Sequence, residues 1–334
     1  MSVIVIRFCI YVAPHLKLIA WPGEHRKHDA PTPVIGGVGV FISIGFTCLI
    51  LDIPIKQYQY LFYASLCLLL VGAIDDVLHL SSTTRFIIQI IAALVIVFPG
   101  QVELETLGRL FSLQEVILGN LGYLFTIFAV IGVINAINMT DGLDGLLGTQ
   151  FILIFGGLYL LVLNGAYETE APMLLALIVS VLAFLFFNLR VGRPRAKLFL
   201  GDAGSMFLGL VVSWYLIRFS QKPVNIIEPV TALWFIALPL SDTITVMLRR
   251  ISHRLSPFDA DRTHIHHLLL HKGFSVNQVV SILSVVGAVL LIVGLVLQKL
   301  GVAEYIRFYV ALSIFTLHMV VTTKYIRKHN LAID

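Results

Sequence analysis

The chain has 334 residues, of which 58% are hydrophobic and only 13% carry a charged side chain. Soluble globular domains contain about 25% charged residues, so the composition excludes an ordinary soluble domain and indicates an integral membrane protein. The formal net charge of +4 is small, and no nucleic-acid partner is expected. Cys9, Cys48 and Cys67 lie in apolar runs, a pattern that predicts neither a disulfide framework nor a CxxC metal site.

Eleven apolar runs approach the length of a membrane-spanning helix. A helix rises about 1.5 Å per residue and the hydrocarbon core is about 30 Å thick, so about 20 apolar residues are needed. The runs cover approximately residues 2–19, 34–52, 58–75, 86–103, 121–138, 145–163, 171–188, 203–220, 229–247, 277–298 and 304–323. The predicted fold class is therefore an all-α polytopic membrane protein with about eleven transmembrane helices, forming a single domain over residues 1–334.

The Lys and Arg residues are concentrated in alternate loops. Most of the 23 follow the odd-numbered runs, and the positive-inside rule then places these loops and the C-terminus in the cytoplasm and the N-terminus outside. Four polar segments fall on this predicted cytoplasmic side: Asp75–Asp76, NMTDGLDG (138–145), LFLGDAGS (198–205) and SPFDADRTHIHH (256–267). Their convergence predicts an active site that is formed by cytoplasmic loops at the membrane surface.

Asp75 and Asp76 end the apolar stretch LLLVGAIDDVLHL, residues 68–80. Two carboxylates at a helix C-terminus oppose the helix dipole and repel each other, so capping does not explain them. A solvated helix end is the structural alternative, and Arg85 is a possible cationic partner. A bound divalent cation would offset both unfavourable terms, and a metal-binding or catalytic role is the interpretation that we prefer.

The two glycine-containing segments each permit a structural and a functional interpretation. Asp141 or Asp144 can cap the helix that is expected to start near residue 145, or they can join Asn138 in a polar site. Asp202 is placed to cap the helix that follows it. A glycine-rich helix N-terminus also accommodates phosphate, and an aspartate there can hold the accompanying Mg²⁺. The residues alone leave these alternatives open.

The segment DRTHIHHLLLH contains His264, His266, His267 and His271. Their spacing does not match a closed tetrahedral zinc site. Neutral imidazoles beside Arg262 suit a multiply charged phosphate ester, since Arg offers a bidentate fork. Acidic metal ligands, cationic phosphate ligands and a lipid boundary together indicate Mg²⁺-assisted phosphoryl transfer from a soluble nucleotide donor to a lipid acceptor.

Several ordered motifs resemble one known family: GAIDDVLHLSSTTRFIIQ, INAINMTDGLDGLLG, RAKLFLGDAGS, EPVTALWFIALPLSDT and SPFDADRTHIHHL. They are similar to the polyprenyl-phosphate N-acetylhexosamine-1-phosphate transferases, in particular the WecA type. The interrupted string His264-Ile265-His266-His267 fits this branch, whereas the peptidoglycan branch usually carries three consecutive histidines. The resemblance covers nearly the whole chain.

The resemblance implies a multi-pass enzyme of the bacterial inner (cytoplasmic) membrane. It implies transfer of N-acetylglucosamine-1-phosphate from UDP-N-acetylglucosamine (UDP-GlcNAc) to undecaprenyl phosphate with release of UMP. This reaction would initiate lipid-linked surface polysaccharides of the O-antigen or enterobacterial common antigen type. The implied cofactor is Mg²⁺, with Mn²⁺ as a possible substitute, and a homodimer is expected by analogy with the family.

The resemblance also implies roles for individual residues. Asp202 would be the principal Mg²⁺ ligand, with Asp75 and Asp76 close to the metal and to the lipid phosphate. Asp141 and Asp144 match acidic residues that are needed for activity. The residues expected to bind substrate are Lys27, Asn138, Asn188, Arg262, His264, His266 and His267.

Two alternatives to this function remain. The same chemistry can use another UDP-N-acetylhexosamine, because the motifs do not identify the sugar. A proton-coupled transporter is the alternative from a different class, and it predicts acidic residues near the bilayer midplane. The sequence instead places its acidic residues at helix ends.

Overall fold

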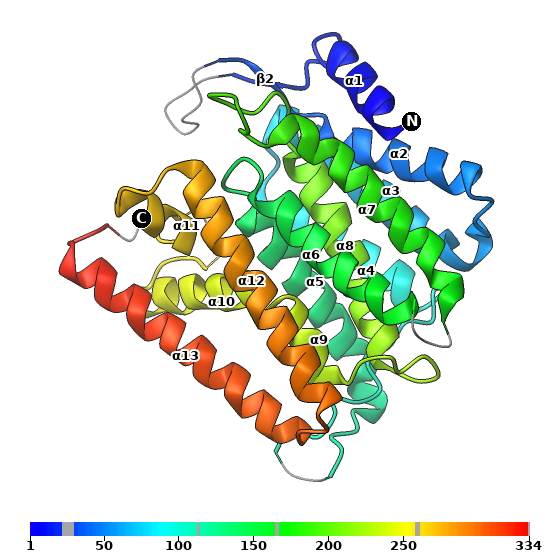
Figure 1. The fold of residues 1–334 in the computed structure, drawn as a ribbon, viewed down its shortest axis with the longest axis vertical. Coiled ribbons are helices and arrows are strands. Elements are labelled where there is room, and N and C mark those ends of the chain that lie inside the picture. The colour runs from blue at the N-terminus through cyan, green and yellow to red at the C-terminus, as the bar shows by residue number, and fades with distance from the viewer. Residues whose placement is uncertain (22–29, 112–113, 164–166, 258–260, 333–334) are drawn as a thin grey trace.

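The structure is a computed structural model that describes residues 1–21, 30–111, 114–163, 167–257 and 261–332. Figure 1 shows a bundle that consists almost entirely of helices. The α-helices are α1 (Ser2–Val12), α2 (Gly36–Ile50), α3 (Gln59–Leu78), α4 (Ser82–Val97), α5 (Gly122–Thr140), α6 (Leu146–Leu163), α7 (Ala171–Asn188), α8 (Gly201–Ser220), α9 (Pro229–Phe235), α10 (Ala237–Ser252), α11 (Ile265–His271), α12 (Val276–Lys299) and α13 (Glu304–Lys328).

The remaining regular elements are short. The strands β1 (Ile19–Ala20) and β2 (Thr32–Pro33) pair antiparallel, with Ala20 opposite Thr32. Three 3₁₀ turns, η1 (Ile55–Tyr58), η2 (Gly119–Leu121) and η3 (Glu168–Glu170), lead directly into α3, α5 and α7. The predicted all-α class is therefore confirmed.

Each predicted apolar run overlaps a helix, but the helices differ in length. Among the described residues, seven helices are long and apolar enough to cross a membrane, or eight if the bent pair α9–α10 is one span. α1, α2 and α4 are shorter apolar helices. The structure thus describes a polytopic membrane protein, while the count of eleven spans and the sidedness of the loops stay predictions.

Two of the predicted spans differ from the helices that the structure contains: one helix is shorter than predicted and the other is bent. The first was expected over residues 2–19, but α1 ends at Val12. The run 229–247 is broken at Ile236, where α9 and α10 meet at a bend of 82°. Pro239 explains the break, because it has no N–H to donate to the carbonyl four residues earlier, at Phe235.

α8 is the central helix of the bundle. About 94% of its apolar stretch is buried inside the molecule, against 11% for α13, which runs along one edge in Figure 1. α8 packs against α2, α3 and α5. The α3–α8 approach is close because Gly72 lies against the backbone of Asp202 and Ala203, where a Cβ would overlap Ala203. This contact brings the C-terminal end of α3 to the first turn of α8.

An ion pair between a half-buried arginine and a buried glutamate fixes the other end of α8. Glu170 is 3% exposed and accepts hydrogen bonds from the Arg218 guanidinium at 2.9 Å and from the Tyr58 hydroxyl at 2.7 Å. The Arg218 guanidinium also lies over the ring of Trp214, 5.0 Å from its centroid. The C-terminal end of α8 is therefore held by a polar contact with η3.

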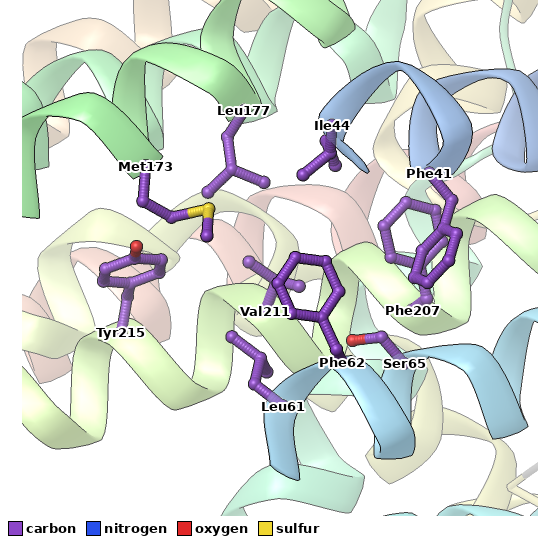
Figure 2. A pocket seen from close by; sticks show the side chains of 10 residues that line it. All are labelled: Phe41, Ile44, Leu61, Phe62, Ser65, Met173, Leu177, Phe207, Val211 and Tyr215. Carbon is purple, nitrogen blue, oxygen red and sulfur yellow. The ribbon is translucent and has the colours of Figure 1, made fainter. Parts of the chain in front are cut away.

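Figure 2 shows an apolar cavity between α2, α3, α7 and α8. Its walls include Phe62, Met173, Leu177 and Tyr215. The cavity volume is about 20 Å³, whereas a single water needs about 10–15 Å³ measured in this way. The space is too small for a nucleotide or a sugar, so the candidate active site lies elsewhere.

Candidate active site

Asp76 caps the N-terminus of α8 from a different helix. Its Oδ1 accepts a hydrogen bond from the backbone N–H of Asp202 at 3.0 Å, and its Oδ2 accepts one from the N–H of Ala203 at 3.4 Å. Helix N-termini leave such amides unsatisfied and favour negative charge. Asp202 was considered as the cap of this helix, but it lies within the first turn of α8. That interpretation is wrong, because Asp76 supplies the cap.

Asp75 is buried beside Asp76, with 3% exposure. Its Oδ1 accepts a hydrogen bond from the N–H of Leu80 at 2.6 Å, which closes the turn after α3. Its Oδ2 is buried and has no hydrogen-bond partner among the described residues. An unpartnered buried carboxylate oxygen is unfavourable unless a cation lies near it.

Arg85 supplies positive charge between two of the aspartates. Its Nη1 lies 3.5 Å from Oδ2 of Asp75 and 3.9 Å from Oδ2 of Asp202. Arg85, the possible cationic partner of the Asp75–Asp76 pair, therefore contacts Asp75 of that pair and also Asp202. Arg85 was not among the predicted site residues, although its place one turn into α4, after the Ser81 cap, was a usable signal.

Asn138 connects the 138–145 segment to the same cluster. Its Nδ2 donates to Oδ1 of Asp202 at 2.7 Å and lies 2.8 Å from Oγ of Ser205. One turn deeper, Asn135 and Gln89 pair through their amides at 2.7 Å. The ends of α3 and α5 and the start of α8 thus meet in one polar network, which we call the aspartate cluster: Asp75, Asp76, Asp202, Asn138 and Arg85.

Asp141 and Asp144 lie in different surroundings. Asp141 is exposed at the end of α5. Asp144 accepts a hydrogen bond from Nε of Arg190 at 2.6 Å and a longer one from the N–H of Ala196 at 3.3 Å. Asp144 therefore joins the 138–145 segment to the basic segment that follows α7.

Asn188 is buried and makes two hydrogen bonds to backbone. Its Oδ1 accepts from the N–H of Gly145 at 2.6 Å, and its Nδ2 donates to the carbonyl of Leu198 at 2.7 Å. It therefore holds the 138–145 segment against the non-helical segment around Leu198 that leads into α8. Its contact with a nucleotide stays a prediction.

The histidines of the 256–267 segment lie next to the 138–145 segment. The rings of His264 and His266 stack with their centroids 5.6 Å apart, and the centroid of the His267 ring lies 4.2 Å from that of His266. Nε2 of His266 is buried without a hydrogen-bond partner in the described part of the chain. It lies so close to Gly142 that a Cβ there would overlap it. The glycine is required by this contact, which brings the histidines beside Asp141.

The environment of His266 keeps its ring neutral. Burial, followed by the positive charge that His267 can carry, lowers the pKa of His266 to about 3. Burial and the neighbouring His264 lower the pKa of His267 as well. Neutral rings can accept a hydrogen bond on one nitrogen while donating from the other.

The remaining predicted residues are exposed at the margin of this region or lie outside the residues that the structure describes. Arg262 is exposed on the surface. His271 is also exposed and lies 3.1 Å from the Tyr325 hydroxyl, at the far end of α11. Lys27 lies outside the described residues.

The aspartate cluster fits a hard divalent cation. In the described ranges, no three His, Cys, Asp or Glu side chains form a ready-made metal cluster. Mg²⁺, however, commonly takes only one or two protein carboxylates together with substrate phosphates and water. The free Oδ2 of buried Asp75 and the Oδ2 of Asp202 lie within 4 Å of the same Arg85 nitrogen. Two carboxylate oxygens therefore already face a common positive charge.

Comparisons with known proteins identify the family of the chain. The family model described as glycosyl transferase family 4 matches residues 58–220, which include the whole aspartate cluster. Three relatives carry the name undecaprenyl-phosphate alpha-N-acetylglucosaminyl 1-phosphate transferase. They come from Yersinia pestis (35% identity over 92% of this chain and 83% of the relative), Escherichia coli strain K12 (35%, 90% and 80%) and Haemophilus influenzae (35%, 92% and 87%). Because these matches span most of both chains, the chain belongs to glycosyl transferase family 4.

Proposed function

We propose that this chain transfers N-acetylglucosamine-1-phosphate from UDP-GlcNAc to undecaprenyl phosphate. The relatives from three organisms, whose printed names describe this transferase, support the proposal over about nine tenths of the chain. The observation that carries it is the hydrogen-bonded meeting of Asp76, Asp202 and Asn138, with Asp75 and Arg85 beside them. Carboxylates and a guanidinium at a helix N-terminus suit a charged phosphate substrate.

The proposed cofactor is Mg²⁺, with Mn²⁺ as a substitute. Asp202 and Asp75 would hold it, since each offers an Oδ2 to the same side of the cluster. When bound, the ion supplies charge neutralisation for the diphosphate and for the transition state. Asp76 uses both oxygens on α8 amides, so its part is to fix the first turn of α8 and with it the Asp202 side chain.

The proposed reaction is a direct displacement. An oxygen of undecaprenyl phosphate attacks the β-phosphorus of UDP-GlcNAc, and the bond between that phosphorus and the bridging oxygen of the α-phosphate breaks. The products are undecaprenyl-diphospho-GlcNAc and UMP. The acceptor is already an anion, so a covalent phospho-aspartate is not needed to generate a nucleophile. Arg85 is placed to bind an oxygen of the entering phosphate as it approaches Asp75.

The donor would be bound by the segments on the other side of the cluster. Asn138 and Asn188 hold the 138–145 segment in place, and the histidine stack lies against Gly142. We assign His264, His266, His267 and Arg262 to the diphosphate and sugar of the donor, with Lys27 in the first loop. Another UDP-N-acetylhexosamine is the alternative donor, and a panel of UDP-sugars distinguishes the two.

The proposed location is the bacterial inner membrane, with the aspartate cluster on the cytoplasmic side. Several apolar helices long enough to span a bilayer support a multi-pass protein. The ends of α3 and α5 and the start of α8 meet in the cluster, so the acidic residues of the aspartate cluster lie at helix ends. This placement favours a surface enzyme over a proton-coupled transporter. A homodimer is proposed by analogy with the family.

A single assay tests the proposal. Purified protein in detergent receives UDP-GlcNAc, undecaprenyl phosphate and Mg²⁺, and the release of UMP is measured. Turnover is expected only when all three are present. UMP release that is independent of the lipid acceptor would indicate a hydrolase, and no release under any condition would contradict the proposed reaction.

A further inference from the structure

Asp242 is a buried carboxylate that no step described above uses. It lies in α10 with 5% exposure. Its Oδ2 is 2.8 Å from Nδ1 of His264, and its Oδ1 accepts a hydrogen bond from the N–H of Ile265 at 2.9 Å. The same Oδ1 lies 3.4 Å from Nε2 of His318, on α13. One carboxylate thus joins α10 to the histidine segment and to the last helix.

The contact between Asp242 and His264 determines which ring nitrogen carries the proton. A carboxylate only accepts hydrogen bonds, so Nδ1 of His264 must be the donor. The opposite nitrogen of the neutral ring, Nε2, is then left without a proton and can accept a hydrogen bond. A carboxylate that bonds one imidazole nitrogen fixes both the tautomer and the direction of the ring.

The rest of α10 holds the same segment in place. Asp242, Arg249 and Arg250 are seven and eight residues apart, so they lie on one face of the helix. The Arg249 guanidinium donates to the carbonyl of Thr263 at 3.3 Å. The Arg250 guanidinium donates to the carbonyl of Ser256 at 2.6 Å and to Asp261 at 3.1 Å. Asp242 is the member of this face whose side chain contacts an imidazole as well as the backbone.

The position of His264 connects Asp242 to the candidate active site. The His264 ring stacks on that of His266 with an angle of 10° between the planes, and Nε2 of His266 lies against Gly142. Thr243, the residue after Asp242, is 3.5 Å from the carbonyl of Ala136 on α5, half a turn before Asn138. The Asp242–His264 pair therefore lies beside the end of α5 that reaches the aspartate cluster.

We infer that Asp242 is a positioning residue for the transfer, acting through His264. Its carboxylate holds the His264 ring so that Nε2 faces the diphosphate of the nucleotide-sugar donor, and it compensates the positive charge when that nitrogen shares a proton with a phosphate oxygen. This inference rests on the proposed function. A carboxylate that orients a functional imidazole in this way typically contributes about 10- to 100-fold to activity.

A double-mutant cycle tests the inference. Asp242→Asn is expected to lower kcat about 10- to 100-fold and to leave the KM for undecaprenyl phosphate unchanged. In a His264→Gln background, Asp242→Asn is expected to have no further effect, because residues that act as a unit are not additive. Glu170→Gln is the matched control: this carboxylate is equally buried and pairs with Arg218 at the other end of α8, so kcat per folded molecule should not change in either background.

The outcomes separate this inference from the proposed function. Wild-type protein that releases no UMP would overturn both. With an active wild type, an Asp242→Asn effect of equal size in both backgrounds would show that Asp242 acts independently of His264, and full activity of His264→Gln would show that no imidazole is needed there. Either result overturns the inference and leaves the transferase reaction intact.

A measurement on the wild-type protein covers the case in which Asp242→Asn does not fold. Nitrogen NMR of the labelled histidine rings reports which nitrogen carries the proton, and the His264 signal is assigned by its loss in His264→Gln. A proton on Nδ1 is expected. A His264 signal from a ring with a bare Nδ1 would overturn the inference.

Discussion

The backbone N–H of Asp202 donates a hydrogen bond to the side chain of Asp76, 126 residues earlier in the chain, at 3.0 Å. This bond ties the end of α3 to the beginning of α8 and fixes the spacing of the three aspartates. The contact is possible because Gly72, one turn before Asp76, has no side chain to separate the two helices. The position of the proposed metal ligand Asp202 thus depends on Asp76, which need not touch the metal itself.

Replacing Asp76 with Ala should therefore impair both stability and activity. The first-turn amides of α8 would lose their acceptor, and loss of an N-cap side chain costs about 0.5–2 kcal/mol. Thermal unfolding in detergent measures this change, and UMP release measures the loss of turnover. Asp76→Asn keeps a carbonyl acceptor and should recover part of the stability. Equal melting temperatures for Asp76→Ala and wild type would contradict the capping role.

Asp75→Asn and Asp202→Asn should each abolish most turnover while the protein stays folded. Both substitutions keep the shape of the side chain but remove a carboxylate oxygen that faces Arg85. A reduction in kcat on the order of 100-fold or more is expected when a charge that stabilises the transition state is lost. The measurements are UMP release and the binding of Mn²⁺ followed by its electron paramagnetic resonance signal.

Glu170→Gln serves as the control for these two variants, because it removes a buried carboxylate at the opposite end of α8. It should lower the melting temperature without changing Mn²⁺ binding. Full activity of Asp75→Asn or Asp202→Asn with saturating Mg²⁺ would remove that residue from the proposed metal site.

Arg85→Gln should separate metal binding from turnover. The Arg85 guanidinium lies within 4 Å of both carboxylates and competes with a cation for them. Because Arg85 is partly exposed, solvent screening limits the effect, and we expect a several-fold lower half-saturating Mg²⁺ concentration. Turnover should nevertheless fall, since the contact with the entering phosphate is lost. Arg85→Lys keeps the positive charge and should retain the wild-type Mg²⁺ requirement. A higher half-saturating Mg²⁺ concentration in Arg85→Gln would show that Arg85 and the cation do not compete for the two carboxylates.

Much of this fold could be predicted from the sequence, because apolar runs of about 20 residues specify their own helices through backbone hydrogen bonds. Asp75, Asp76 and Asn138 could be assigned to a polar site since each ends such a run. The break at Ile236 was missed. The run 229–247 has the length of a spanning helix and was therefore predicted as one continuous helix, although Pro239 within it lacks the N–H that a continuous helix needs.

Contacts between distant segments were harder to predict than the elements themselves. Asp76 rather than Asp202 caps α8, and only the packing of α3 on α8 decides between them. The role of Asp242 could not be predicted from its own segment, because its partner His264 is 22 residues away and on another element. Sequence alone gives the identities of such residues, but the tertiary fold determines which of them meet.

His266 should make the protein sensitive to acid. Its pKa falls from 6.5 to about 3 in the folded protein because the ring is buried next to His267. Above pH 6.5 the ring is neutral in both the folded and the unfolded chain and contributes no pH dependence. Between pH 6.5 and 3 the unfolded chain binds a proton at His266 and the folded protein does not. The free energy of unfolding therefore decreases by up to about 1.4 kcal/mol for each unit by which the pH falls in this range.

Melting temperatures of wild type and His266→Asn between pH 8 and pH 5 measure this contribution. His266→Asn should flatten the acid side of the profile, since its side chain does not titrate. Parallel profiles for wild type and His266→Asn would show that the His266 ring takes up its proton over the same pH range in the folded protein as in the unfolded chain. The contact with Gly142 would then involve a charged rather than a neutral ring.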